Sequence, residues 1–329
     1  MTTKISVVIC TRDRADLIGQ AVESVAACDY PEFDLHVMDQ STDDATRTIV
    51  LALSAKHADR CPIHYHHLAQ AGLSRAYNAG FRVSDGPVIA CTDDDVIVPA
   101  DWLAKIAHAF ATDPELGLLY GQVLVADSLA SVDPGTIVPS LVWSQRERLH
   151  ESDRNFKVWG MGANMAVRRS AMTVIGGFDE MMGGGAPLRS SQDFDFALRT
   201  YRAGFSVLLD PEVKVDHYGA RTADQWPGTL AAYGVGDGAF LGKHVRCRDP
   251  FALWLLTKKM TRMVAKVGVD SVRARRPIGP GAYNRNLFTG LKQGARYDVD
   301  RTTRLYREND RARGGVTEAN AVTSGNRPG

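Results

Sequence analysis

The first half of the chain alternates short apolar runs with longer segments in which apolar residues recur at helical spacing. The runs predict buried strands at 4–10, 33–41, 63–68 and 87–95. The segments between them predict helices at 14–28, 44–58 and 72–84. Because strands separated by helices of this length form βαβ units, the pattern predicts an α/β fold on a mostly parallel sheet.

The second half of the chain is more mixed. It predicts strands at 116–125 and 205–211, a strand entering a helix within 159–178, and a helix at 192–204. Residues 127–158 are loop-rich, and glycines interrupt 176–192. The pattern is helical from Trp226, and from Arg307 it is polar without periodicity. We therefore expect an α/β domain at 1–225, a helical C-terminal extension at 226–306 and a disordered tail at 307–329.

The composition is that of an ordinary globular protein. At 329 residues, 44% of them apolar, the chain can bury a full core. A formal net charge of +1 gives no global basic field, so we expect no nucleic-acid partner. The five cysteines are scattered and lack CxxC spacing, which argues against disulfides or a zinc site and favours a reduced cytoplasm.

The stretch "VIACTDDDVIVPADW" places three aspartates directly after a predicted strand. Side chains alternate along an extended segment, so Asp93 and Asp95 would point together and Asp94 away. Two carboxylates at a strand end suit Mg²⁺ or Mn²⁺. The alternative is a turn and helix cap, a role that Asp101 can also fill. In a parallel sheet, Asp39 and the Thr11–Asp13 loop would lie at the same edge.

Seven stretches, in order, resemble the inverting family 2 glycosyltransferases with a GT-A fold, whose Rossmann-like sheet is flanked by helices. They are "SVVICTRDR", "VMDQSTDD", "GLSRAYNAGF", "PVIACTDDDVIVPADWL", "GANMAVRR", "GGFDE" and "SSQDFDFALRTYRAGF". The resemblance covers about residues 4 to 220. It implies a nucleotide-sugar donor bound by Thr11, Arg12, Arg14, Asp39, Arg75, Asp93 and Asp94. It also implies a metal ion, Mn²⁺ or Mg²⁺, bound by Asp93, Asp95 and His217.

The same resemblance places the general base in the predicted helix 192–204. Asp193 and Asp195 would lie about 200° apart on a regular helix, so both cannot serve one site. Asp195 stands four residues before Arg199 and can pair with it. Asp193, at the helix start, is therefore the expected base, with helix capping as its alternative. The chain carries Gln192 where the family usually has Glu, which affects how the acceptor is positioned.

Several other residues support two interpretations each. Trp159 is either a stacking wall for a sugar ring or a core residue. Gly184, within the glycine run 183–185, belongs either to a lid over the donor and acceptor or to an ordinary surface loop. The cluster His64, His66 and His67 has no carboxylate nearby in sequence, so we expect a partly exposed strand there and no metal site.

Neither a signal peptide nor a membrane span is predicted, because the run Ile5 to Cys10 is too short and no apolar stretch approaches about 20 residues. Residues 250–276 nevertheless join apolar side chains to seven cations between 257 and 276. Such a helix can rest on the inner face of the plasma membrane, which would suit a lipid-linked acceptor. The alternative is a helix packed on the catalytic domain with a solvated basic face.

These observations predict a cytoplasmic, metal-dependent enzyme that moves one sugar from a nucleotide-diphosphate donor, UDP-linked, to a hydroxyl acceptor. The acceptor would be a glycan, a lipid-linked sugar or a small molecule. The transmembrane helices and QxxRW motif of processive relatives are not found in the sequence, which favours single addition. The alternatives are a sugar nucleotidyltransferase and a donor-binding or scaffold protein that has lost catalysis.

Overall fold

The computed structural model describes residues 2–129, 136–157, 160–277 and 279–307. The chain forms two compact units. The first unit comprises residues 1–178 and 192–226, and the second comprises 179–191 and 227–329. The chain therefore leaves the first unit at Phe178, returns to it at Gln192 and leaves it again at Trp226. The tail from 308 onward, predicted to be disordered, lies outside the described residues.

The first unit is built on one mixed sheet in the strand order β3-β2-β1-β4-β8-β6-β9-β5, with β7 paired to β9. Pairing is parallel for β3-β2-β1-β4 and for β6-β9, and antiparallel around β8 and where β5 and β7 meet β9. This confirms the predicted α/β class. The strands are β1 (Ile5–Thr11), β2 (Phe33–Asp39), β3 (Ile63–His67), β4 (Val88–Asp93), β5 (Val96–Ile97), β6 (Leu116–Val125), β7 (Glu147–Leu149), β8 (Asn164–Arg168) and β9 (Ser206–His217).

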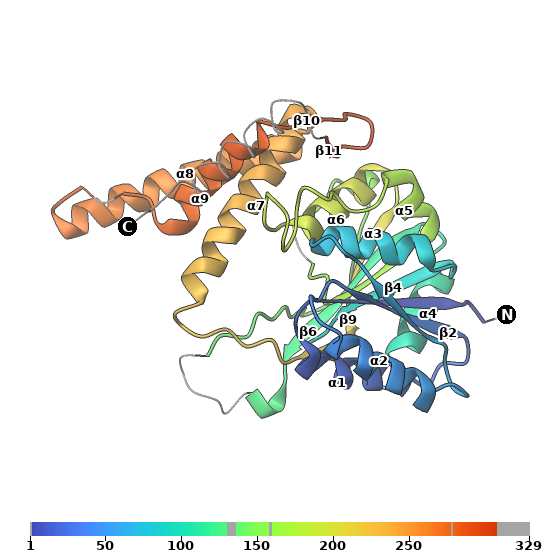
Figure 1. Ribbon diagram of the computed structural model, residues 1–329. Helices are drawn as coiled ribbons and strands as arrows, with labels where there is room; N and C mark the ends of the chain where they lie inside the picture. Colours follow the sequence, from blue (N-terminus) through green and yellow to red (C-terminus); the bar gives the residue numbers. More distant parts are fainter. Residues whose placement is uncertain (1, 130–135, 158–159, 278, 308–329) are drawn as a thin grey trace, which may run out of the picture. The chain divides into compact units, whose positions relative to one another are not determined.

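Helices cover both faces of this sheet, as Figure 1 shows. The helices α1, α2 and α4 lie on one face and α3, α5 and α6 on the other. Their bounds are α1 (Ala15–Ala26), α2 (Ala45–Lys56), α3 (Leu73–Val83), α4 (Trp102–Thr112), α5 (Arg169–Ile175) and α6 (Gln192–Arg202).

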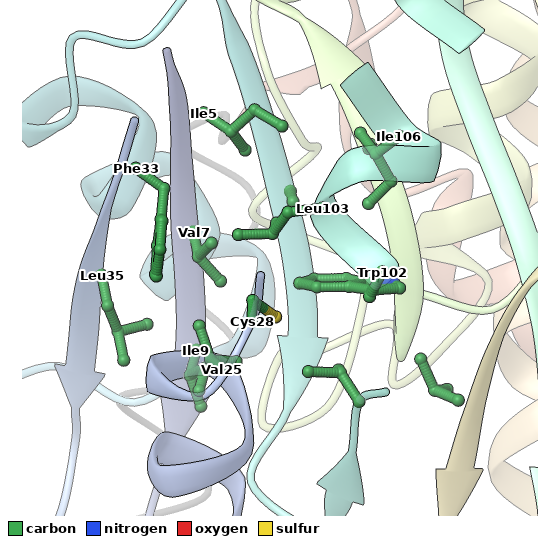
Figure 2. Packing of buried hydrophobic residues seen from close by; sticks show 14 of the residues in the cluster. Ile5, Val7, Ile9, Val25, Cys28, Phe33, Leu35, Trp102, Leu103 and Ile106 are labelled. Carbon is green, nitrogen blue, oxygen red and sulfur yellow. The ribbon is translucent and has the colours of Figure 1, made fainter. Parts of the chain in front are cut away.

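Strand alternation divides the core between the two faces. Ile5, Val7 and Ile9 of β1 pack with side chains of α1 and α4, including Val25 and Trp102 (Figure 2). The even-numbered positions of β1 face α3, where a Cβ on Gly80 would lie 2.6 Å from Val8. Both faces of β1 are therefore buried, which explains its continuous apolar sequence.

The strand register gathers polar residues at one edge of the sheet. Thr11 lies opposite Asp39, and Cys10 lies opposite Asp93. The strand β4 ends at Asp93, and the next two residues form a turn before β5. The alternation predicted for residues 93–95 is therefore wrong, because only the first of the three aspartates is in an extended strand.

The second unit contains three long helices, α7 (Trp226–Arg246), α8 (Pro250–Ala274) and α9 (Ala282–Gly294), and a hairpin of β10 (Asp298–Val299) and β11 (Tyr306–Arg307). The helices α7 and α9 pack closely through glycine, since a Cβ on Gly238 would lie 2.0 Å from the Leu287 carbonyl oxygen. Within the described part of the chain, no helix is both long enough and apolar enough to cross a bilayer.

The segment 179–191 belongs to this unit through buried contacts. The Asp179 carboxylate lies 2.5 Å from Lys243 Nζ and accepts a hydrogen bond from the Tyr306 backbone N–H at 2.8 Å. Ser191 Oγ donates to Asp237 at 2.8 Å. Gly184, for which the sequence left open a lid or an ordinary surface loop, is an exposed residue of this segment.

Candidate functional site

The loop after β1 binds the acidic turn that follows β4. Thr11 Oγ1 donates to Asp94 Oδ2 at 2.6 Å, and Arg14 Nη1 donates to Asp94 Oδ1 at 2.6 Å. Arg14 Nη2 also donates to Asp95 Oδ2 at 2.5 Å. Strand alternation predicted that Asp94 points away from the site. That prediction is wrong, because Asp94 binds Thr11 and Arg14. One guanidinium holds two neighbouring carboxylates because both lie in a turn that faces the end of β1.

The next group along this edge is His217, the last residue of β9. The pairing of β5 with β9 sets Val96 opposite His217, which brings the imidazole beside the aspartate turn. Its Nδ1 lies 2.8 Å from the Pro139 carbonyl oxygen, and its Nε2 lies 3.3 Å from Asp95 Oδ1. A carbonyl can only accept, so Nδ1 carries a proton. Burial lowers the pKa of His217, but Asp95 raises it overall, so Nε2 can carry a proton that it donates to Asp95; a bound cation would take the place of that proton.

Gly219 lies directly against this pair and has no side chain to collide with it. A Cβ at this position would lie 2.4 Å from Asp95 Oδ2 and 2.5 Å from His217 Nε2. Carboxylate oxygens with one imidazole are a donor set suited to Mn²⁺, and the backbone carbonyl behind the imidazole is the partner that metal-binding histidines commonly have. The residues present therefore fit the divalent cation that the sequence predicts.

The three aspartates of the turn differ in their electrostatics. Burial raises the pKa of Asp93 to about 6, and nearby Asp95 adds to the effect. Burial also raises the pKa of Asp94 to about 7, although Arg14 and Thr11 oppose it. Burial alone would raise the pKa of Asp95 as well, but His217 and Arg14 lower it to about 2. The carboxyls of the turn therefore disfavour one another's ionised forms, and a bound cation would relieve this repulsion.

Asp193, the predicted base, lies at the start of α6 and contacts a separate segment. Its Oδ2 accepts a hydrogen bond from the Gly162 backbone N–H at 3.1 Å. Its Oδ1 is buried and has no hydrogen-bond partner among the described residues. Burial raises the pKa of this carboxyl to about 6, while the Gly162 N–H lowers it. A helix-capping aspartate does not need a hydrogen bond to Gly162, whereas a general base needs an unpartnered carboxylate oxygen. The geometry therefore favours the general base over the helix cap.

Tyr77 of α3 connects the base to the acidic turn. Its fully buried side chain donates from Oη to Asp93 Oδ1 at 3.1 Å. A Cβ on Gly162 would lie 3.4 Å from Tyr77 Oη and 3.8 Å from Asp193 Oδ1. The hydroxyl and the free carboxylate oxygen therefore flank the same glycine. The sequence did not single out Tyr77, because a tyrosine on the buried face of a helix has the pattern of any core aromatic.

Asp39 lies fully buried at the end of β2. Its Oδ1 accepts from the Ser41 backbone N–H at 2.8 Å, and its Oδ2 accepts from Tyr65 Oη at 2.9 Å. Burial and this hydrogen bond raise the pKa of Tyr65 to about 12, so the phenol remains a donor. Each carboxylate oxygen keeps a second lone pair that can accept from a ligand. Tyr65, in a histidine-rich strand, is a second residue that the sequence did not reveal.

The remaining predicted residues lie less centrally. Half of the Arg12 side chain is exposed, and its Nε lies 3.3 Å from Asp13. Arg75 Nη1 donates to Gln70 at 2.5 Å. Gln192 is the first residue of α6, and Trp159 lies outside the described residues. Asp195 pairs with Arg199 at 2.8 Å in a buried position, which confirms that part of the prediction.

Comparisons with known proteins agree with this arrangement. Residues 6–173 match the family model described as Glycosyl transferase family 2. The chain is 27% identical over 131 residues to an uncharacterized glycosyltransferase of Nostoc, which covers 40% of each protein. It is 23% identical over 244 residues to the glucosyl-dolichyl phosphate glucuronosyltransferase of Haloferax volcanii, covering 68% of this chain and 72% of that protein.

Two solved structures share the fold. The mannosyltransferase PcManGT of Pyrobaculum calidifontis, in complex with GDP-Man and Mn²⁺, superposes with a TM-score of 0.58 at 17% identity, covering 100% of this chain and 77% of that one. S. aureus TarS 1–349, in complex with UDP-GlcNAc, gives a TM-score of 0.51 at 16% identity, covering 71% of this chain and 66% of that one. The sheet and helices described above are thus those of GT-A glycosyltransferases.

Proposed function

Because the chain belongs to glycosyl transferase family 2, the family and enzyme class that its sequence predicts, we propose that it transfers one sugar from a nucleoside-diphosphate sugar to a hydroxyl acceptor with inversion at the anomeric carbon. The observation that carries this proposal is the unpartnered Oδ1 of Asp193, which is buried near Tyr77 and the acidic turn. A carboxylate oxygen held beside the acceptor position is what an inverting transfer needs from its base.

In this reaction, Asp193 Oδ1 takes the proton of the acceptor hydroxyl. The acceptor oxygen forms its bond to the anomeric carbon as the bond from that carbon to the diphosphate oxygen breaks. The nucleoside diphosphate leaves with the bonding electrons. The raised pKa of Asp193 makes its carboxylate a better proton acceptor near neutral pH than an ordinary aspartate.

A divalent cation, Mn²⁺ or Mg²⁺, would be held by Asp93, Asp95 and His217. When bound, it supplies positive charge that stabilises the departing diphosphate. The contribution of the chain itself is positional. Arg14 and Thr11 fix the turn through Asp94, the Pro139 carbonyl orients His217, and Gly219 leaves room beside them.

We propose that the donor is UDP-linked and that its nucleobase and ribose lie against the loop after β1 and Asp39. The carboxylate of Asp39, held by Tyr65 and Ser41, can accept from a uracil N–H or a ribose hydroxyl. The solved structures named above contain GDP-Man and UDP-GlcNAc. They support a nucleotide-sugar donor, and the identity of its nucleobase is a matter for experiment. Arg12, half exposed on this loop, has reach towards a phosphate or base.

We also propose that the acceptor is lipid-linked and that α8 rests on an anionic membrane surface. Leu253, Trp254, Val264, Val269 and Val272 of this helix are each between 48% and 78% exposed. Lys258 Nζ lies 4.5 Å from the Trp254 ring centroid, so cation and aromatic form one surface. Apolar side chains beside cations are what an interfacial helix presents. The name of the Haloferax relative, which acts on glucosyl-dolichyl phosphate, supports an acceptor of this class.

The family assignment disfavours a sugar nucleotidyltransferase, and the free Asp193 oxygen disfavours a scaffold that has lost catalysis. A thermal-shift panel tests the proposal directly. The purified protein is heated with UDP- and GDP-sugars, each with Mn²⁺ or with EDTA, and sugar release is followed in parallel. We expect a UDP-sugar with Mn²⁺ to give the largest stabilisation. Turnover undiminished in EDTA would contradict the proposed metal dependence. A preference for GDP-sugars would contradict uracil as the nucleobase of the donor.

A further inference from the structure

A second cluster of metal-binding side chains lies at the opposite end of the same strands. Asp34 and His36 are on β2, and His64 lies opposite His36 on β3. Because side chains alternate along a strand, Asp34 and His36 share one face with His64. Along β2, Asp34 lies about 16 Å and His36 about 10 Å from Asp39 of the carboxyl-end site, and His64 lies level with His36. The cluster is therefore separate from the proposed donor and metal residues.

Two atoms of this cluster are buried and unsatisfied. Asp34 and His36 are each 5% exposed. Asp34 Oδ1 and His36 Nε2 lie 3.4 Å apart, and neither has a hydrogen-bond partner among the described residues. Buried polar atoms are satisfied in the great majority of cases, so a pair left open on facing groups calls for a ligand between them.

The surroundings explain why these two atoms remain available. Asp34 Oδ2 lies 2.7 Å from Lys4 Nζ, which leaves Oδ1 as the free oxygen. His36 Nδ1 lies 3.2 Å from His66 Nε2. When Nδ1 donates to His66, the Nε2 of a neutral His36 is a bare lone pair facing a carboxylate oxygen. Two acceptors in contact are compatible with a metal ion, which accepts both lone pairs.

His64 completes a set of three ligands. Its ring stacks on His36 with centroids 4.9 Å apart, and the side chain is exposed. One ligand atom each from Asp34, His36 and His64 lies within 4.8 Å of the other two. Ligand atoms around a tetrahedral zinc ion are about 3.3 Å apart, so the set needs a small movement. The exposed His64 ring can supply that movement.

We propose that Asp34, His36 and His64 bind one divalent transition-metal ion of the zinc class, with its fourth position open to water. Two imidazoles and one carboxylate favour zinc, cobalt or nickel over Mg²⁺ and Ca²⁺. The ion joins the edge strand β3 to β2 and stabilises the sheet from outside the proposed donor site. Its binding is independent of the reaction proposed above.

Titration of Zn²⁺ into the metal-stripped full-length protein tests this site. We compare wild type with His64→Ala, an exposed change that leaves the core intact, and with His67→Ala as the matched control. His67 is also exposed on β3 but points to the other face. We expect His64→Ala to weaken one Zn²⁺ binding event at least tenfold by calorimetry, and His67→Ala to leave it unchanged.

Two further measurements separate this site from the aspartate turn. Co²⁺ bound to two imidazoles and a carboxylate gives visible absorption, and this contribution to the spectrum should be lost in His64→Ala and kept in Asp95→Ala. Because Zn²⁺ can also bind at the aspartate turn, it should raise the melting temperature of wild type and His67→Ala more than that of His64→Ala. Identical Zn²⁺ affinity in wild type and His64→Ala, or a Co²⁺ spectrum lost only in Asp95→Ala, would overturn the proposal and leave Asp34 and His36 as an ion pair.

Discussion

Asp193 accepts a hydrogen bond from the Gly162 backbone N–H through Oδ2 alone, at 3.1 Å. The bond fixes the carboxylate in one orientation and leaves Oδ1 unpartnered among the described residues. Asparagine at this position can keep the same bond through its amide oxygen but cannot accept a proton. The two roles of Asp193, orientation and proton acceptance, can therefore be separated by experiment.

We expect Asp193→Asn to lower kcat by about 10²–10⁴, the contribution typical of a general base, while donor affinity stays within about twofold. Transfer is measured by acceptor glycosylation, and donor affinity by calorimetry with a nucleotide sugar and Mn²⁺. Asp59→Asn, an exposed substitution that removes the same charge, is the control. Near-normal transfer by Asp193→Asn would contradict the assignment of Asp193 as the general base.

The pH dependence follows from the raised pKa of Asp193. A base must be ionised, so kcat/KM should rise with pH through about 6 and level off above it. An aspartate with an ordinary pKa would instead give a profile that is already flat at pH 5. The residual activity of Asp193→Asn should lack the step at 6. A step that persists in this variant would assign it to another carboxyl, such as that of Asp93.

The same raised pKa affects stability with a defined sign. An acid whose pKa is higher in the folded state than in the unfolded state favours the protonated fold, so its contribution is lost as pH rises from about 4 to 6. Replacing Asp193 by Asn should therefore stabilise the protein at pH 8, by at most about 3 kcal/mol, and have no effect at pH 3. Urea midpoints at the two pH values measure this difference, and equal shifts at both would contradict it.

Gly219 offers a test of the metal residues that leaves every ligand in place. The Cβ of Gly219→Ala would lie within 2.5 Å of Asp95 Oδ2 and His217 Nε2, so these side chains must move. We expect the Mn²⁺ concentration for half-maximal activity to rise at least about tenfold, the loss typical when ligand orientation is disturbed. Gly228→Ala, whose Cβ meets nothing within 4 Å, is the control. Unchanged Mn²⁺ dependence would argue against metal binding beside Gly219.

Asp94→Ala should be more damaging than strand alternation predicts. The variant leaves the buried Thr11 hydroxyl and one arm of Arg14 without their partner, which costs about 1–3 kcal/mol. Urea denaturation measures this loss, and transfer assays should show weaker donor binding as Arg14 is released. Wild-type stability and activity in Asp94→Ala would mean that the Arg14 contact does not organise the site.

The proposed membrane contact of α8 depends on its exposed apolar residues. Replacing Leu253 and Val272 by Ser should reduce binding to anionic vesicles at least about tenfold, because each buried aliphatic side chain contributes about 1.5 kcal/mol. Co-sedimentation with anionic and with neutral vesicles measures the effect. Val174→Ser, an exposed apolar residue of α5, is the control. Equal binding by all variants would leave α8 as a solvated helix.

The sequence predicted β1, β2, β4 and β6 well, but it predicted a strand at 205–211 where β9 extends from Ser206 to His217, and it missed the shortest strands. The strands β1 and β4 are largely apolar because both of their faces are buried, and β2 is likewise buried at every position although it carries Asp34, His36 and Asp39. The strands β5 and β7 have two and three residues and exist through pairing with β9, so they show no periodicity of their own. The parallel strands could therefore be inferred, whereas the antiparallel pairing of β8 in the middle of the sheet, and of β5 and β7 with β9, could not.

The sequence named the residues proposed to bind donor and metal, but it did not reveal the residues that support them. Asp39 and His217 were recognisable from their motifs, and their positions at strand ends follow from the register. Tyr65 and Tyr77 were not, because their roles arise from contacts between elements distant in sequence. The prediction for Asp94 was wrong because nothing in "TDDD" marks where the extended backbone ends.

The segment 179–191 makes the second unit discontinuous in sequence. Asp179 is buried against Lys243 and Tyr306, so a protein cut after Trp226 would keep this aspartate without either partner. A buried charge left unpaired destabilises a fold strongly. The C-terminal helices are consequently not a detachable appendage that could be exchanged between relatives at a single junction. Any chimera or minimal fragment must take both pieces from the same parent.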